Sequence, residues 1–171
     1  MAEHAAPLQV ELVRGLEAFE QLAPGWDELV LAMRRPSPFL LHDLCATWWG
    51  RPENAVEPVV AVARRAGRLV GALPLEVRRS AGLRIASFPG GHNAALADLL
   101  LDPAEPDATG RALLSALRGA PYDVAWLYGI PGGSRLAECG AQLRLSERVE
   151  CPVLDMPEGF DEAYQTRVGG H

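Results

Sequence analysis

The stretch that decides the fold is residues 59–88, VVAVARRAGRLVGALPLEVRRSAGLRIASF, in the middle of the chain. Two apolar runs flank Ala66-Gly67, a pair that is typical of a tight turn between antiparallel strands. In the second run, apolar or small residues occupy alternate positions from Leu69 to Val77, which is the period of a strand with one face towards a core. A further turn at residues 78–82 leads into a strand at 83–88. The stretch therefore predicts a three-stranded antiparallel meander.

The residues before the meander predict one strand followed by two helices. Apolar and polar residues alternate over 8–13 as they do in a strand. Apolar residues then recur at helical spacing over residues 16–33, with an interruption at Pro24-Gly25. After a short break, Ser37-Pro38 is typical of a helix start, and an apolar stripe follows over residues 41–48.

The residues after the meander predict alternating helices and strands. The short apolar run at 95–101 is either a strand or a helix. We then expect a helix at 107–118 ended by Gly119, a strand at 122–130, a short helix capped by Ser134 and a strand at 148–154. The whole order is β-α-α-β-β-β-α-β-α-β. Because single strands and a meander are mixed with helices, we expect an α/β (α+β) fold with a mostly antiparallel central sheet flanked by helices, and no regular βαβ winding.

Composition restricts the class of protein. The chain has 171 residues, of which 49% are hydrophobic and 22% charged, as in an ordinary globular domain. Its 22 acidic residues outnumber its 16 basic ones and give a formal net charge of −6, which argues against a nucleic-acid partner. All 16 basic residues are arginine, so a catalytic lysine is excluded.

The amino terminus and the cysteines indicate a cytoplasmic protein. The first 15 residues lack the basic and apolar regions of a signal peptide. No apolar run approaches the ~20 residues that a membrane span needs. The three cysteines, Cys45, Cys139 and Cys151, show no CxxC spacing. We therefore expect buried free thiols in a reducing compartment and no metal site.

Three stretches resemble one family of enzymes. Residues 24–50, PGWDELVLAMRRPSPFLLHDLCATWWG, resemble the opening of the FemAB-like, double-GNAT (GCN5-related N-acetyltransferase) proteins associated with bacterial cellulose and polysaccharide biosynthesis. The hairpin at 61–79, AVARRAGRLVGALPLEVRR, resembles the second and third strands of that family. Residues 108–119, ATGRALLSALRG, are similar to the start of the helix that binds acetyl-CoA in GNAT enzymes.

The resemblance implies both a fold and an activity. It implies a GNAT-like fold and transfer of an acyl group from acetyl-CoA or another acyl-CoA to an amine on a small molecule or an envelope precursor. It covers only the amino-terminal half of the family, whose members continue with a second GNAT domain, so we expect the chain alone to be weakly active or inactive. The alternative is a degenerate GNAT-fold module that binds no CoA and acts in docking or dimerisation as a homo-oligomer.

The resemblance places the cofactor at the start of the helix expected over 107–118. A pyrophosphate needs convergent backbone N–H groups, which the first turn of a helix supplies. The GNAT pattern Gln/Arg-x-x-Gly-x-Gly/Ala makes Gly110, Arg111 and Ala112 the candidate cofactor-binding residues. Asp107 stands at the first position of the pattern and departs from it, because a carboxylate repels a pyrophosphate. The alternative is that Asp107 caps the helix and Gly110 permits close packing.

Two further residues are candidates for catalysis. His92, in PGGHN at 89–93, is a candidate general base with Asp98 as a candidate partner; the alternative is an exposed histidine in a glycine turn. Tyr128 is a candidate general acid, a role that the resemblance gives to a tyrosine near the departing thiolate; the alternative is packing in the sheet. The PGGS segment at 131–134 is a second candidate anion site or a serine-capped turn.

The carboxyl end predicts a division of the chain. We expect a GNAT-like domain over 1–157 and, at 158–171, the start of a helix towards a missing second domain. The apolar stripe of Phe160 and Tyr164 runs into Gly169-Gly170 before it reaches the length that a stable helix needs. We expect the last residues to be frayed and apolar surface to be exposed near the last strand.

Overall fold

The structure is a computed structural model that describes residues 6–93, 96–140, 144, 146–147 and 150. The strand expected at 148–154 and the helix expected from 158 lie outside the described residues. So do Cys151 and the boundary at residue 157.

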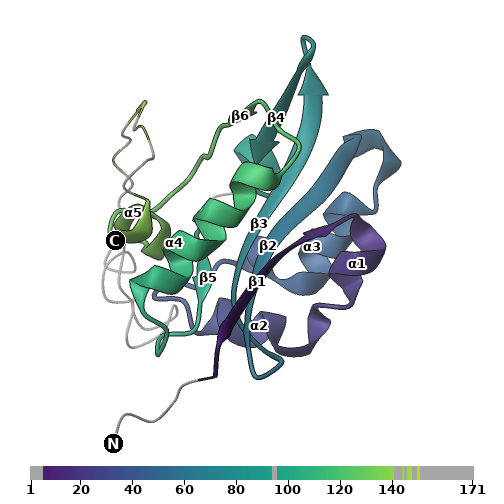
Figure 1. Ribbon diagram of the computed structural model, residues 1–171. Coiled ribbons are helices and arrows are strands. Elements are labelled where there is room, and N and C mark those ends of the chain that lie inside the picture. Colours follow the sequence, from purple (N-terminus) through teal and green to yellow (C-terminus); the bar gives the residue numbers. More distant parts are fainter. Residues whose placement is uncertain (1–5, 94–95, 141–143, 145, 148–149, 151–171) are drawn as a thin grey trace, which may run out of the picture.

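A mostly antiparallel sheet forms the centre of the molecule (Figure 1). Its strands are β1 (Leu8–Arg14), β2 (Val56–Arg65), β3 (Arg68–Ser80), β4 (Leu83–Ser87), β5 (Leu100–Leu101) and β6 (Val124–Ala125). The strand order is β1-β2-β3-β4-β6, and β5 also pairs with β3. Among the strands of the described residues, the pairing is antiparallel except between β4 and β6, which run parallel. The predicted fold class is confirmed.

The meander forms where the sequence predicts it. Arg65 pairs with Arg68 across the first turn, in which Ala66 and Gly67 have φ values of 47° and 79°. Positive φ at both turn residues matches the twist of the flanking strands. The second turn, Ala81-Gly82, has φ values of 49° and 83°. Glycine takes such angles without steric cost, which explains its place in both turns.

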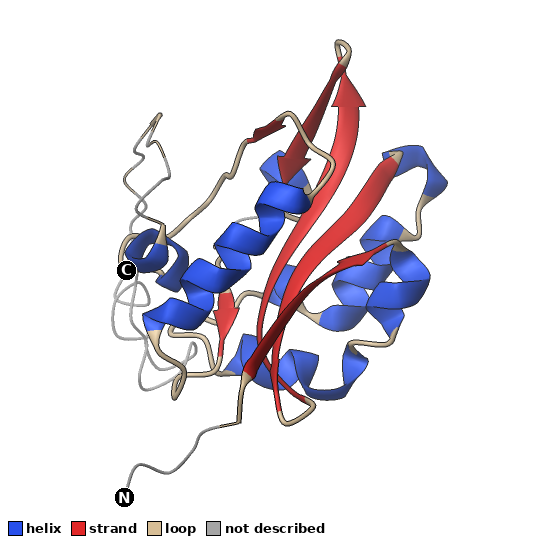
Figure 2. Ribbon diagram, in the orientation of Figure 1, coloured by secondary structure: helices blue, strands red, loops and turns tan. Residues whose placement is uncertain are grey.

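Helices cover both faces of the sheet (Figure 2). They are α1 (Leu16–Glu20), α2 (Ala23–Leu31), α3 (His42–Trp49), α4 (Asp107–Ala116) and α5 (Arg135–Cys139). The first three lie on one face, and α4 lies on the other with α5 beside it. Alternate residues of β2 face the two layers: Val59 and Ala61 pack in the cluster that includes α4, and Val60 and Val62 pack against α1–α3. The centre of the sheet is therefore buried on both sides.

One strand position beside β3 is interrupted. The carboxyl-terminal half of β3 pairs with β4, from Glu76↔Ser87 to Ser80↔Leu83. Its amino-terminal half pairs with β5, at Gly71↔Leu101 and Ala72↔Leu100. The chain between β4 and β5 leaves the sheet, so that only the end of the apolar run expected at 95–101 becomes a strand. This excursion carries the PGGHN segment and Asp98.

The structure shortens the strand expected at 122–130 to β6. Val124 and Ala125 pair with Ile85 and Ala86 of β4. Because β4 ends at Ser87, the described residues supply no parallel strand beside the chain that follows β6.

Two helix ends also differ from the sequence-based expectation. Helix α4 ends at Ala116, and its last turn tightens into a 3-10 helix over Leu117–Gly119 rather than ending at a glycine cap. Ser37 precedes a 3-10 turn, and α3 begins only at His42. The N–H of His42 donates to the Asp27 carboxylate of α2 at 2.8 Å, so a distant side chain supplies the N-terminal partner.

Within the described residues, no helix is long and apolar enough to cross a membrane.

Candidate functional site

Helix α4 begins three residues before Gly110, the first of the candidate cofactor-binding residues. Asp107 is the first helical residue and Pro106 precedes it as the N-cap, so Asp107 is not the cap. In an α-helix, only the N–H groups of the N-cap and of the first three helical residues lack a partner within the helix. Gly110, Arg111 and Ala112 are the fourth to sixth helical residues, so their N–H groups lie within the hydrogen-bonded part of α4.

Carboxylates surround this turn, and arginines of this chain pair with them. Glu105 accepts a hydrogen bond of 2.7 Å from the Arg65 Nε–H group and one of 2.7 Å from the Thr109 hydroxyl. The bond from Arg65 is the main reason that the pKa of Glu105 lies below its usual value. Asp107 pairs with Arg135 at 3.2 Å, and the Arg135 guanidinium also donates to the Glu105 carbonyl at 3.0 Å. These contacts join α4, β2 and α5.

Asp102 adds a third acidic side chain immediately after β5. It accepts from the N–H of Ala104 at 2.9 Å and from Arg68 at 2.7 Å. The Ala104 bond, followed by the Arg68 bond, holds the pKa of Asp102 below its usual value.

Gly110 is enclosed by the protein itself. A Cβ added there would lie 2.6 Å from Cys139 Sγ and 2.8 Å from Leu99 Cδ2. A real Cβ does not approach other atoms so closely, so the glycine allows α5 and the chain before β5 to pack against α4. Arg111 is exposed and Ala112 is half-buried.

The residues at this turn do not fit a CoA pyrophosphate. The motif amides lie inside the helix, the Gly110 face is covered, and the carboxylates of Glu105 and Asp107 lie at the turn where phosphates would approach. Like charges repel, and Arg65 and Arg135, the two arginines that contact this turn, are already paired with Glu105 and Asp107.

The PGGHN segment leads into a second cluster, around Glu76. The backbone of His92 lies in a short 3-10 turn, Gly91–Asn93, next to the end of β4. The N–H of Gly90 donates to the Glu76 carboxylate at 3.2 Å. The indoles of Trp48 and Trp49 donate to the same carboxylate oxygen at 2.8 and 3.1 Å. The segment is thereby tied to both β3 and α3.

Glu76 is the residue that the sequence-based predictions missed. It is fully buried in β3, and Arg78 contacts its second oxygen at 3.3 Å. The available signal was one acidic residue between Leu75 and Val77 in a strand that is otherwise apolar or small over residues 69–77. A buried carboxylate needs hydrogen-bond donors, and here two tryptophans, a backbone amide and an arginine supply them.

Asp98 occupies the N-terminus of α5. Its carboxylate accepts from the N–H groups of Leu136 at 2.8 Å and Arg135 at 3.0 Å, and from its neighbour Leu99 at 2.7 Å. Burial raises the pKa of Asp98 despite these bonds. The Ser134 hydroxyl accepts from the N–H of Ala137 at 3.1 Å, which confirms Ser134 as a cap of the short helix. The N–H groups of Arg135 and Leu136, which directly follow the PGGS segment, therefore already bind a carboxylate of this chain.

Tyr128 lies beyond β6 and stacks on Trp126. The ring centroids are 5.6 Å apart and the planes differ by 9°. Trp126 is 52% exposed, whereas Trp26 and Trp49 are buried in the core. Trp126 follows β6, which lies at the edge of the described sheet.

The cysteines of the described chain are buried and unpaired with one another. Burial raises the pKa of Cys45 to about 12 and also raises that of Cys139. No group of three or more His, Cys, Asp or Glu residues that could hold a metal ion occurs in the described part of the chain.

Comparison with known proteins identifies the fold. No family model matches the sequence, and no curated protein is found as a relative. The structure is similar to an aminoglycoside acetyltransferase from an uncultured soil metagenomic sample. In its complex with sisomicin the TM-score is 0.54 at 14% identity, and in its complex with trehalose it is 0.53 at 15% identity. Each match covers 87% of this chain and 96% of that chain.

A third similar structure is a ribosomal-protein-alanine N-acetyltransferase from Brucella melitensis biovar Abortus 2308. Its TM-score is 0.49 at 16% identity, over 88% of this chain and 99% of that chain. The mostly antiparallel sheet flanked by helices is the fold of GNAT acetyltransferases.

Proposed function

We propose that the chain is one GNAT-fold unit of a bacterial, cytoplasmic N-acyltransferase of the FemAB-like type. The complete enzyme transfers an acyl group from acetyl-CoA or another acyl-CoA to an amine on a small molecule or an envelope precursor. The observation that carries this proposal is the fold, which matches an acetyltransferase over 87% of the chain.

The closed α4 turn supports a division of labour between two units. Because Glu105 and Asp107 lie at the turn and pair with Arg65 and Arg135, we propose that this unit does not supply the pyrophosphate site. A second GNAT unit must then bind the acyl-CoA, and the unit described here packs beside it. The catalytic roles of His92 and Tyr128 remain predictions from the sequence.

A second candidate is a docking module that forms a dimer and binds no CoA. The exposed Trp126, together with Val124 and Leu83 at 41% and 51% exposure, favours it. Val124 lies on the edge strand β6, Trp126 follows it directly, and Leu83 is the first residue of β4, the strand that pairs with β6. Apolar side chains grouped at a sheet edge are typical of contact surfaces.

Thermal unfolding with acetyl-CoA tests the first proposal. The chain alone is expected to show no shift, whereas the protein with its second unit is stabilised by about 2.7 kcal/mol at 100 times the dissociation constant. Absence of a shift in the two-unit protein would refute acyl-CoA binding.

Light scattering tests the docking candidate separately. A dimer that Trp126→Ser converts to a monomer would support it, with Arg51→Ser, an exposed position outside that sheet edge, as the matched control. A monomer at all concentrations would eliminate dimerisation.

A further inference from the structure

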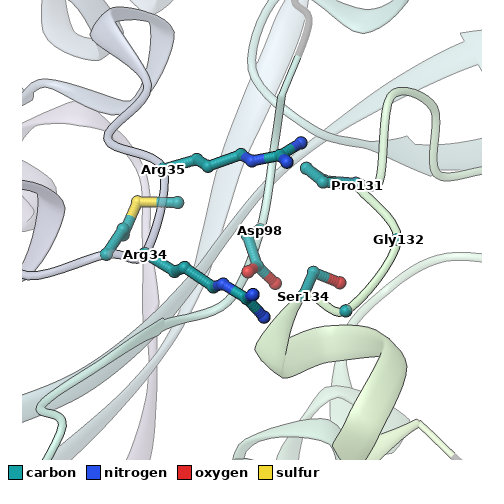
Figure 3. Close-up of a pocket in the computed structure, with 8 residues that line it drawn as sticks. Arg34, Arg35, Asp98, Pro131, Gly132 and Ser134 are labelled. Atoms are coloured by element: carbon teal, nitrogen blue, oxygen red, sulfur yellow. The ribbon is translucent and has the colours of Figure 1, made fainter. Parts of the chain in front are cut away.

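A small cavity lies between the loop that follows α2 and the loop that precedes α5 (Figure 3). Its volume is about 60 Å³, and Arg34, Arg35, Asp98 and Ser134 are among its lining residues. Figure 3 shows both arginine side chains extending from the first loop towards the side of the cavity formed by Pro131 and Ser134. The space accommodates a group the size of a phosphate or a carboxylate, since one water needs about 10–15 Å³ by the same measure.

The two arginines that line this cavity lack a carboxylate partner in the described structure, unlike most arginines that contact a neighbouring segment. Elsewhere such arginines meet carboxylates, as Arg65 meets Glu105 at 2.7 Å and Arg84 meets Asp123 at 2.9 Å. Arg34 and Arg35 make no hydrogen bond or ion pair with any residue in the described part of the chain. Two unpaired guanidinium groups at one cavity repel each other unless an anion lies between them.

Asp98 does not neutralise these arginines. Its oxygens accept from the N–H groups of Leu99, Arg135 and Leu136, and no arginine side chain lies within ion-pair distance of them in the described structure. The amides of α5 are thereby occupied as well. The polar groups of the cavity that are free to bind a ligand therefore include the guanidinium N–H groups of Arg34 and Arg35.

The loop on the opposite side lies close to one guanidinium. A Cβ added at Gly133 would lie 3.4 Å from Arg34 Nη1, and Gly133 has a φ of +70°. Glycine at this position allows both the left-handed backbone and the close approach of the arginine. Gly133 therefore helps to keep the cavity narrow on the Arg34 side.

We propose that the Arg34–Arg35 cavity binds the anionic oxygens of a small molecule, as a phosphate or carboxylate group. A planar guanidinium matches two oxygens of such a group, and two guanidiniums from adjacent residues bind it from neighbouring directions. The site is separate from the α4 turn and does not depend on acyl transfer.

Titration calorimetry at low salt tests this site with inorganic phosphate and with acetate as probes. Arg34→Gln and Arg35→Gln are each expected to weaken binding by at least about tenfold, because each removes charge-assisted hydrogen bonds. Arg51→Gln is the matched control, since Arg51 is also exposed and lies outside the cavity. Its affinity for the probes is expected to equal that of the unaltered chain.

Two-dimensional NMR on the same proteins locates the bound anion. The amide resonances of Gly132 and Gly133 are expected to shift with phosphate, with acetate or with both, and not in the Arg34→Gln/Arg35→Gln double variant. Binding of only one probe would assign the ligand chemistry within the proposal. No binding of either probe, or an equal loss in Arg51→Gln, would overturn it.

Discussion

The indole N–H of Trp48 donates a hydrogen bond of 2.8 Å to the carboxylate of Glu76. This contact joins α3 to the middle of β3 and ties down a carboxyl group in the core of the protein. Trp49 donates to the same oxygen at 3.1 Å, so two consecutive tryptophans hold one carboxylate. The PGGHN segment is attached to this pair through the N–H of Gly90.

Replacing Glu76 by glutamine should therefore destabilise the protein more than its small change in shape suggests. We expect Glu76→Gln to lower the free energy of unfolding by about 2 kcal/mol, because glutamine has one acceptor oxygen where both oxygens of Glu76 accept hydrogen bonds. Urea unfolding measures the change, and the indole N–H resonances of Trp48 and Trp49 should shift in NMR spectra. The matched control is Glu57→Gln.

Glu57 is a suitable control because it pairs with Arg14 on the surface, at 45% and 52% side-chain exposure. An exposed pair contributes about 0–1 kcal/mol. Equal losses in Glu76→Gln and Glu57→Gln would show that the buried network adds nothing.

Gly110→Ala tests why the glycine is present in α4. The new methyl group would meet Cys139 Sγ at 2.6 Å and Leu99 Cδ2 at 2.8 Å, so α5 must shift. We expect a loss of about 1–3 kcal/mol in thermal unfolding, as for overpacked cores. Cys139→Ala in the same chain should restore part of it. A Gly110→Ala variant as stable as the unaltered chain would contradict the close packing.

The Arg65–Glu105 pair should make stability depend on pH. The hydrogen bond from Arg65 lowers the pKa of Glu105 below its ordinary 4.5, so the folded protein binds fewer protons than the unfolded chain just below that pH. The stabilisation is present above pH 4.5 and is lost as the pH falls through the folded-state pKa.

Glu105→Gln checks this dependence directly. We expect the variant to lose about 1–2 kcal/mol at pH 7, because two hydrogen bonds to a charged acceptor are weakened. The difference from the unaltered chain should shrink as the pH is lowered below 4.5. Glu20→Gln, at an exposed position, serves as the control. A difference that stays constant from neutral to acid pH would rule out the proposed role of the pair.

The framework of the fold was predictable because its signals are local. The turns at Ala66-Gly67 and Ala81-Gly82 and the alternation along β3 lie within a few residues of one another in the chain. Strand β6 was overestimated because its length depends on where β4 ends. That end is a property of the sheet, and the apolar pattern of 122–130 does not contain it.

The candidate site was less predictable because its contacts join distant residues. Trp48 and Glu76 are 28 positions apart, and Asp98 and Leu136 are 38 apart. The glycine pattern around Gly110 indicated a phosphate site, but the same residue type also serves close packing. The three carboxylates before and within α4 were visible in the sequence, and only the fold shows that Arg65, Arg68 and Arg135 pair with them.

Titration calorimetry of this chain with acetyl-CoA tests the central claim most directly, namely that its own carboxylates close the first turn of α4 to a pyrophosphate. The account predicts no saturable heat of binding, either for the unaltered chain or for Asp107→Gln, because Glu105 and the packed Gly110 face still close the turn. Saturable binding by the unaltered chain that becomes tighter in Asp107→Gln would contradict the account and place the cofactor at α4.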